Sequence, residues 1–307
     1  MKLIIIASLI SLYLQNAFSK YRFVIYTDQS PPTKAREVVN YFKTTTPFNE
    51  FQMEFVIENL SSKELDCRSH HSIDRLITCN TNEITKRAYN RDYDQVFVVS
   101  DSAKYGGSGG EVPVITSSPK TPVTIIGHEY LHRLGFCDEY QYSAQEANYY
   151  CTESYLSSTL NAAIITPLSN GYHSDQHAKK THNSDIPWYA KIDPDTFIST
   201  GQTLGTPNKF SKRIGLFPSK NCSKKSPAIH VWQPGGIATI MKNLNAPIGP
   251  YVDILREALT SKGIPTIMRQ PAPPPVPHCR DQELQLPLDK EEIKRTFEAV
   301  IPKFNAQ

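Results

Sequence analysis

The sequence has almost no net charge and no second long apolar run. Its 33 Lys and Arg residues nearly balance its 30 Asp and Glu residues, which leaves a formal net charge of +3. Nucleic-acid-binding domains carry clearly basic surfaces, so this composition gives no argument for a nucleic-acid partner. After the first 19 residues, no segment is long and apolar enough to suggest a transmembrane helix. No C-x-x-C pair occurs either, which disfavours a cysteine-rich metal site.

The first 19 residues have the pattern of a secretory signal. Lys2 precedes the apolar run Leu3–Leu14, and Ala17-Phe18-Ser19 is a small-x-small cleavage pattern. An uncleaved membrane anchor is the alternative, but the run is short for a bilayer span. We expect residues 1–19 to be a cleaved signal peptide. The mature chain then starts near Lys20, is secreted or periplasmic, and has no stable membrane anchor.

The cysteine content fits an exported chain. An even number of cysteines in such a chain predicts disulfides. The six are Cys67, Cys79, Cys137, Cys151, Cys222 and Cys279. Their short separation favours a bond between Cys67 and Cys79. We hypothesise that Cys137 pairs with Cys151 or Cys222, and that Cys279 ties the C-terminal tail to the body.

Strand and helix patterns alternate in the first half of the chain. Residues that alternate between apolar and polar, or that are apolar throughout, predict strands. These strands are Tyr21–Thr27, Phe51–Ile57, Asp94–Val99 and Val112–Thr116. Helices are expected at Thr33–Phe42, Asn82–Tyr89, Ala147–Leu156, Trp188–Ile192 and Tyr251–Ser261. The order of these elements predicts an α/β (α+β) fold with a mixed sheet.

The predicted organisation has three parts after the signal. Residues 20–138 form an N-terminal catalytic subdomain with the sheet and the motif helix. Residues 139–268 form a smaller, irregular C-terminal subdomain that ends in a helix, because regular signals are sparse there. Residues 269–307 are a Pro-rich linker and C-terminal tail, with a polyproline spacer at Pro271–Pro277 and a terminal helix at Asp289–Ala299.

The most informative stretch of the chain predicts a helix with a defined start and end. Thr121 is a suitable N-cap, and Pro122 suits the first helical position. Gly135 suits the left-handed residue that ends a helix. One apolar stripe is expected to pack on the sheet. Its residues are Val123, Ile126, Tyr130 and Leu134.

The same stretch, from His128 to Asp138, fits the pattern H-E-x-x-H-x-x-G-x-x-D. His128 and His132 are four residues apart on a helix, so their rings lie on one face and can share one ion. After the turn at Gly135, Asp138 can supply a third ligand. Two imidazoles and one carboxylate leave a fourth position for water, which is typical of catalytic zinc sites. A solvated helix with coincidental histidines is the alternative.

This ligand set predicts a hydrolase. Zinc lowers the pKa of a bound water to about 7 and polarises a carbonyl. Glu129 follows the first ligand and is placed to act as general base, taking the proton of the zinc-activated water and passing it to the leaving amine. We therefore expect a zinc-dependent endopeptidase with a protein or peptide substrate.

The chain resembles the metzincin metallopeptidases at these residues, and in particular the family of the IgA peptidases, through H-E-Y-L-H-R-L-G-F-C-D-E-Y. The Gly-rich Ala103–Val112, the segments Ile214–Pro218 and Val231–Pro234, and Thr239–Lys242 followed by Tyr251–Ser261 also resemble that family. The resemblance implies a metzincin-like fold with a twisted mixed sheet and an active-site helix. It also implies a Met-turn in which Met241 lies beneath the zinc as a hydrophobic floor.

The chain departs from these family patterns in three places, one of which is Phe136-Cys137, where the family usually has small and aliphatic residues before Asp138. It has one residue fewer between His132 and Asp138, a spacing that is the general metzincin one. Asn243 stands where many metzincins have a Tyr two residues after the Met, so that role is unassigned, and Tyr251 is interpreted as a helix start. Met268, in a near-copy of the Met-turn sequence, is the alternative to Met241.

Several weaker signals remain open. Gly106–Gly110 lacks the Lys-Ser/Thr of a phosphate loop and is interpreted as a turn before the edge strand Val112–Thr116, along which an extended substrate could pair. Glu139 is the alternative third ligand. A second metal at His173, His177 and His182 is possible by composition, but the preferred interpretation there is a polar loop, because Gly171 disfavours a helix.

Two other functions are compatible with the same residues. The first is a zinc amidase that acts on cell-wall peptide or a modified amine. The second is a catalytically silent secreted binding protein, which the intact Glu129 disfavours, because a silent descendant need not keep its base.

Overall fold

The structure is a computed structural model that describes residues 20–69, 77–102, 107–108 and 114–267. All of these belong to one compact unit that ends at Ile267. The expected signal peptide, the polyproline spacer, the tail helix and Cys279 lie outside the described residues. No helix in the described ranges is long and apolar enough to cross a membrane. The boundary between residues 20–138 and 139–268 stays a prediction.

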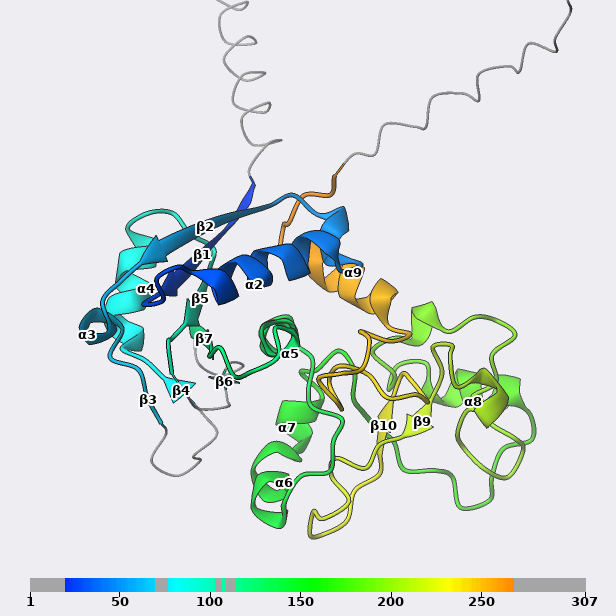
Figure 1. Cartoon of the computed structure of the whole chain (residues 1–307). Coiled ribbons are helices and arrows are strands. Elements are labelled where there is room, and N and C mark those ends of the chain that lie inside the picture. Colours follow the sequence, from blue (N-terminus) through cyan, green and yellow to red (C-terminus); the bar gives the residue numbers. More distant parts are fainter. Residues whose placement is uncertain (1–19, 70–76, 103–106, 109–113, 268–307) are drawn as a thin grey trace, which may run out of the picture. The chain divides into compact units, whose positions relative to one another are not determined.

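A five-stranded sheet with strand order β2-β1-β5-β7-β6 forms the first half of the chain (Figure 1). The parallel strands are β1 (Tyr21–Thr27), β2 (Met53–Asn59), β5 (Gln95–Val99) and β7 (Val114–Ser117), and β6 (Gly107–Ser108) is antiparallel to β7. The four predicted strands are confirmed, with β1 at its predicted bounds and the others shifted by at most two residues. The expected mixed α/β class is also confirmed.

Helices cover both faces of this sheet (Figure 1). They are α2 (Thr33–Thr44), α3 (Ser62–Leu65), α4 (Thr81–Tyr89) and α5 (Thr124–Arg133), with the short 3₁₀ helix η1 (Phe48–Glu50) after α2. Side chains of a strand point to opposite faces in turn. In β1, Phe23 and Ile25 therefore join the core under α2 and α5, while Val24 and Tyr26 join the core under α4. Both faces are buried, as expected for parallel strands.

Tyr130 fixes α5 on the sheet. Its ring lies 5.5 Å from Phe23 and 6.0 Å from Phe97, both on strands, and 5.6 Å from Phe42 of α2. The contacts are edge-to-face, a favourable arrangement for aromatic pairs. Ile126 and Leu134 of the same stripe are also buried. The predicted packing stripe is therefore confirmed, and it fixes the rotation of the helix about its axis.

The second half of the described chain is built from short elements. They are α6 (Ala144–Tyr150), α7 (Glu153–Leu156), β8 (Ala163–Ile164), α8 (Asp175–His182), η2 (Tyr189–Lys191), η3 (Asn208–Phe210), β9 (Phe217–Pro218), β10 (Val231–Gln233) and α9 (Val252–Ser261). Strands β8, β10 and β9 form a small antiparallel sheet. The helices expected around residues 147, 189 and 251 are confirmed, the first as two short helices.

Two disulfides form among the described cysteines. Cys67–Cys79 closes the hairpin of β3 (Arg68–Ser69) and β4 (Ile77–Thr78), as predicted. The second bond joins Cys151 to Cys222. The hypothesis that Cys137 takes part in a disulfide is wrong: its thiol is free and buried, in the same apolar cluster as that second bond. Burial raises the pKa of this thiol well above its usual range, so it is held as the neutral form.

Two further expectations are wrong. The stretch after His173 is not a loop but helix α8. Its cap is Ser174, three residues beyond Gly171, whose side chain accepts a hydrogen bond from the His177 amide. The strand that starts near residue 112 is not the edge of the sheet. Gly107 and Ser108 pair with Ser117 and Thr116, so the Gly-rich segment itself supplies the edge strand there.

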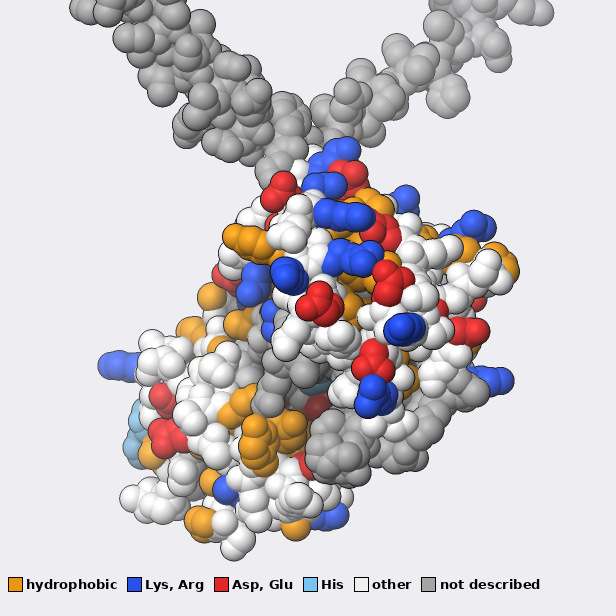
Figure 2. Space-filling model, turned by 90° about the vertical axis from the view of Figure 1, so that its left-hand side faces the viewer, with side chains coloured by type: hydrophobic (Ala, Val, Ile, Leu, Met, Phe, Trp, Pro, Cys, Tyr) orange, Lys and Arg blue, Asp and Glu red, His pale blue; other side chains and the backbone are white. Residues whose placement is uncertain are grey.

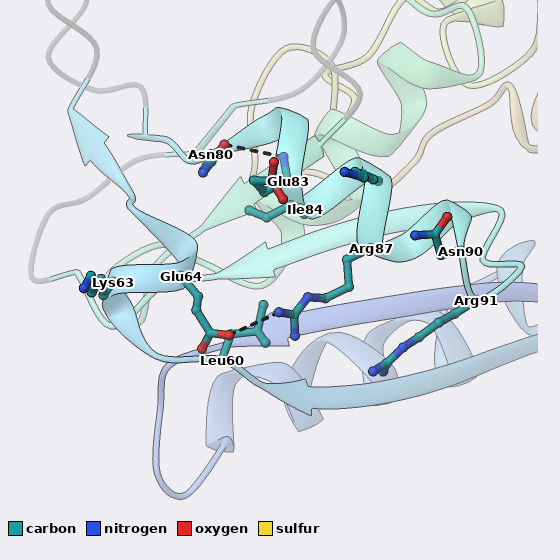
Figure 3. Close-up of a pocket in the computed structure, with 10 residues that line it drawn as sticks. Leu60, Lys63, Glu64, Asn80, Glu83, Ile84, Arg87, Asn90 and Arg91 are labelled. Carbon is teal, nitrogen blue, oxygen red and sulfur yellow. Dashed lines mark hydrogen bonds and ion pairs between the residues drawn. The ribbon is translucent and has the colours of Figure 1, made fainter.

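A pocket of about 430 Å³ lies between α3 and α4 (Figure 3). Leu60 and Ile84 are buried in its floor, in the core on the far side of the sheet from α5. Arg87 reaches across it to Glu64, at 3.1 Å. Charged side chains of both signs are mixed on the upper part of the corresponding face of the molecule (Figure 2). The charges of Arg87 and Glu64, which face each other across this pocket, are therefore matched.

Candidate metal site

The motif helix begins later than predicted and ends where predicted. Thr121 is not its N-cap, because its hydroxyl bonds to Ser118 within a preceding turn, and α5 begins at Thr124. At the other end, Gly135 has a φ of 97°, the left-handed region that favours glycine. The Gly135 and Phe136 amides donate to the carbonyls of His132 and Leu131. This Schellman motif reverses the chain and carries Asp138 back toward the helix.

The structure brings the three predicted ligands together. Nε2 of His128 lies 3.2 Å from Nε2 of His132. Oδ1 of Asp138 lies 3.1 Å from the first nitrogen and 3.4 Å from the second. The side chains are 9 %, 13 % and 13 % exposed, respectively, so the group is shielded but not sealed from solvent. Within the described residues, three potential ligand side chains lie close enough together to hold one metal ion at His128, His132 and Asp138.

Backbone carbonyls orient both imidazole rings. Nδ1 of His128 lies 3.0 Å from the Ile240 carbonyl, and Nδ1 of His132 lies 2.8 Å from the Phe136 carbonyl. A carbonyl oxygen only accepts, so each Nδ1 carries a proton and donates it. In the neutral form of each ring, the Nε2 lone pair would therefore face the other Nε2 and Asp138. Metal-binding histidines are commonly oriented in this way.

Charge in this group is strongly coupled. Burial tends to lower the pKa of His132, but the charges of Asp138 and Glu129 outweigh it and raise this pKa to about 9. Burial opposes ionisation of Asp138, but the neighbouring His132 outweighs it and holds the pKa of that carboxyl well below its usual range. Oδ1 of Asp138 makes no hydrogen bond. Three inward-facing acceptors of this kind need a shared positive charge, supplied by a proton or by a cation.

The donor set and its spacing fit a divalent metal ion. At zinc–ligand distances of 2.0–2.1 Å, tetrahedral geometry separates the ligand atoms by about 3.3 Å. The three observed separations of 3.1–3.4 Å bracket this value. Two imidazoles with one carboxylate suit zinc and other first-row transition metals better than calcium or magnesium, which prefer oxygen ligands. The group could therefore hold a metal ion.

The alternative third ligand has another role. Glu139 is 1 % exposed and makes its hydrogen bonds with Thr239 and Asn161 instead of the histidines. Burial raises the pKa of Glu139 to about 7, although these hydrogen bonds oppose the shift. Glu129 is half-buried and close enough for its charge to act on His132. Its place as general base stays a prediction.

The proposed Met-turn lies against the ligand loop. Met241 is fully buried, and its carbonyl accepts the Glu139 amide at 3.0 Å. Its role as a floor beneath a metal stays a prediction, and Met268 lies outside the described residues. Tyr251 directly precedes α9 and packs on Phe136, with ring centroids 5.5 Å apart, which supports its interpretation as a helix start.

Among the described histidines, His173, His177 and His182 do not form a comparable group. Both ring nitrogens of His182 are used, by Tyr172 at 2.8 Å and by Asp185 at 3.0 Å. His173 and His177 stack with centroids 5.1 Å apart. Within the described part of the chain, none of these three histidines belongs to a group of three close ligand side chains. A second metal ion at His173 and His177 would therefore lack a third protein ligand.

Sequence reasoning missed two asparagines that hold the ligand loop. Asn161 bonds to both the amide and the carbonyl of Cys137, and Asn221 donates to the carbonyl of Asp138 at 3.0 Å. They lie 24 and 83 residues from their partners. No local pattern marks such residues, because their spacing reflects the fold of the intervening chain.

Comparison with known proteins does not identify this site. No protein-family model matches the chain, and no curated protein matches it. The chemical interpretation of the His128–His132–Asp138 group therefore depends on its own geometry.

Proposed function

We propose that this protein is an exported zinc-dependent endopeptidase of the metzincin type. The observation that carries the proposal is the triangle of Nε2, Nε2 and Oδ1 atoms at 3.1–3.4 Å, with Glu129 next to the first ligand. The resemblance of the motif and of the Thr239–Lys242 segment to metzincins supports it. Export is supported by the two disulfides, which are typical of oxidising compartments.

The proposed mechanism assigns one task to each residue. Zinc bound here would lower the pKa of a water and polarise the scissile carbonyl. His128, His132 and Asp138 would hold the ion, and the backbone carbonyls of Ile240 and Phe136 keep the two imidazole rings oriented for it. Glu129 accepts the proton of the attacking water on a carboxylate oxygen and gives it to the leaving amine. The water oxygen bonds to the carbonyl carbon first, and the peptide C–N bond breaks when the leaving nitrogen takes the proton from Glu129.

The test is Glu129→Ala. It removes the base but no ligand, so we expect cleavage of a proteome-derived peptide library to fall by at least about 100-fold. Metal analysis of the purified variant should still give one zinc per chain. Glu129→Gln, which keeps the side-chain size, should lose activity to a similar degree, and the surface variant Glu83→Ala should not.

Three outcomes separate the alternatives. Chelator-sensitive cleavage that survives in Glu129→Ala would exclude this mechanism. Zinc binding without cleavage of any peptide, by the parent protein, would favour a binding protein. Hydrolysis restricted to cell-wall peptides would favour the amidase.

A further inference from the structure

A buried carboxyl group ties the third ligand's loop to a distant segment. Oε2 of Glu139 accepts a hydrogen bond from the Thr239 hydroxyl at 2.6 Å, and Oε1 accepts one from Asn161 Nδ2 at 3.2 Å. The Glu139 amide donates to the Met241 carbonyl at 3.0 Å. Glu139 and Thr239 are 1 % and 0 % exposed. Two of these three bonds reach segment 239–241, a hundred residues further along the chain.

The same distant segment orients the first ligand. Ile240, between Thr239 and Met241, provides the carbonyl to which His128 Nδ1 donates. Glu139 follows Asp138 directly in the chain. One side chain therefore fixes the segment that orients His128 relative to the loop that carries Asp138.

The opposite side of the loop is fixed by the same network. Asn161, which donates to Glu139, also brackets the Cys137 backbone, with distances of 2.7 Å to its amide and 2.9 Å to its carbonyl. Both ends of the Cys137–Glu139 segment thus have partners. The freedom of Asp138 Oδ1 to move relative to the two Nε2 atoms is correspondingly small.

Stability alone does not account for a carboxyl group in this position. Burying a carboxyl costs free energy even when it is hydrogen-bonded, and an apolar side chain would fill the space without that cost. Hydrogen bonds add direction, because they hold donor and acceptor at fixed distances and angles. A metal site requires its ligands to be held at fixed positions, and the groups that hydrogen-bond to the ligands or to their loops provide this.

We propose that Glu139 is the positioning residue of the metal site, which sets metal affinity by locking the loop of Asp138 to segment 239–241. The proposal rests on the proposed function, since it assumes that the triad binds zinc. Glu139 itself touches neither metal nor substrate. Its effect reaches the ion through Asp138 and, by way of Ile240, through His128.

The experiment compares zinc affinities, measured by competition with a chromophoric chelator on the full chain. Loss of a group behind a metal ligand typically weakens binding by about 10–100-fold, and we expect this for Glu139→Ala. Glu139→Gln, which keeps the length and one acceptor oxygen, should recover part of the loss. Thr239→Val, which removes only the hydroxyl, should also weaken binding.

Thr206→Val is the matched control. Thr206 is a buried threonine of the same half of the chain, and its hydroxyl accepts a hydrogen bond from the Leu216 amide at 2.7 Å. Both valine variants lose one buried hydrogen bond, so both should lower the free energy of unfolding. Only Thr239→Val should weaken zinc binding and shift the visible absorption of bound Co²⁺, which reports ligand geometry.

The outcomes distinguish the two proposals. If zinc binding by the parent protein is absent or survives His128→Ala, the metal site itself is wrong, and this inference with it. If the parent binds zinc through His128, but Glu139→Gln and Thr239→Val bind it as tightly as Thr206→Val does, the positioning role alone is wrong. The Gln and Val variants decide this even if Glu139→Ala does not fold.

Discussion

Gly135 is the residue whose backbone conformation places the third ligand. A side chain with Cβ at a φ of 97° costs energy through clashes with the following carbonyl. Space is not the obstacle, because an added Cβ would lie 3.4 Å from Leu160 Cγ, an ordinary contact. A substitution at Gly135 would therefore cost free energy through backbone strain alone, at the turn that leads to Asp138.

We expect Gly135→Ala to lower the free energy of unfolding by about 1–2 kcal/mol and to weaken zinc binding. Gly263→Ala is the matched control, because Gly263 has a φ of 74° and ends α9 with the same pair of hydrogen bonds. Denaturant unfolding should show a similar loss in both, and chelator competition should show weaker zinc binding only for Gly135→Ala. Unchanged zinc affinity in Gly135→Ala would contradict the role given to this turn.

The grouping of the three proposed ligands could be predicted from sequence because they lie within eleven residues. His128, His132 and Asp138 are related by helix periodicity and one turn, both of which are local properties. Thr239 and Asn161 could not be recognised, since their function depends on packing between segments 22 to 100 residues from Glu139. For the same reason, Glu139 was interpretable only as a competing ligand.

At the scale of elements, α5 and α2 pack side by side on one face of the sheet. Gly127 of α5 faces Tyr41 of α2: an added Cβ would overlap the Tyr41 hydroxyl and lie 2.6 Å from its Cε1. Tyr41 is partly buried, and this burial raises the pKa of its phenol above the usual range. Glycine is therefore needed here for close approach, one residue before His128.

We expect Gly127→Ala to destabilise the protein by about 1–3 kcal/mol through overpacking. Combining it with Tyr41→Leu, which removes the colliding ring, should cost less than the sum of the two single variants. Denaturant unfolding of the four proteins completes this cycle. Additive losses would show that α2 and α5 do not meet at this pair.

Elements with strong periodicity were predictable, and those with mixed signals were not. β1 is rich in aromatic and β-branched residues, and its bounds were predicted correctly. The start of α5 was misplaced because Thr121 has the residue type of a cap but bonds to Ser118. The interpretation of His173–His177 as a loop was wrong because Gly171 lies outside α8, which begins after its cap Ser174.

Across the whole molecule, the two disulfides differ in the length of chain they close. Cys151 and Cys222 are 71 residues apart, and Cys67 and Cys79 are 12 apart. Loop-closure entropy predicts stabilisation of about 4 and about 3 kcal/mol, respectively. The pairing itself could not be predicted from sequence for the longer loop, because only the fold decides which of three neighbouring cysteines is left free.

We expect Cys151→Ser with Cys222→Ser to lower the free energy of unfolding more than Cys67→Ser with Cys79→Ser does. Thermal or denaturant unfolding measures the difference. Alkylation of the unfolded, unreduced protein, followed by peptide mapping, should label Cys137 and neither Cys151 nor Cys222. A label on Cys151 would show that Cys137 has taken its place in the bond.

The carbonyl of Ile240 has a consequence for the order in which the protein is completed. All three ligands leave the ribosome more than a hundred residues before this carbonyl, so a nascent chain carries the motif long before it can align His128. If the group binds zinc as proposed, tight metal binding awaits the docking of segment 239–241. The ion would then be acquired late, because a chain cut short before Thr239 keeps His128, His132 and Asp138 but not the carbonyl that aligns His128. Metal occupancy would in that case report that this part of the fold is complete.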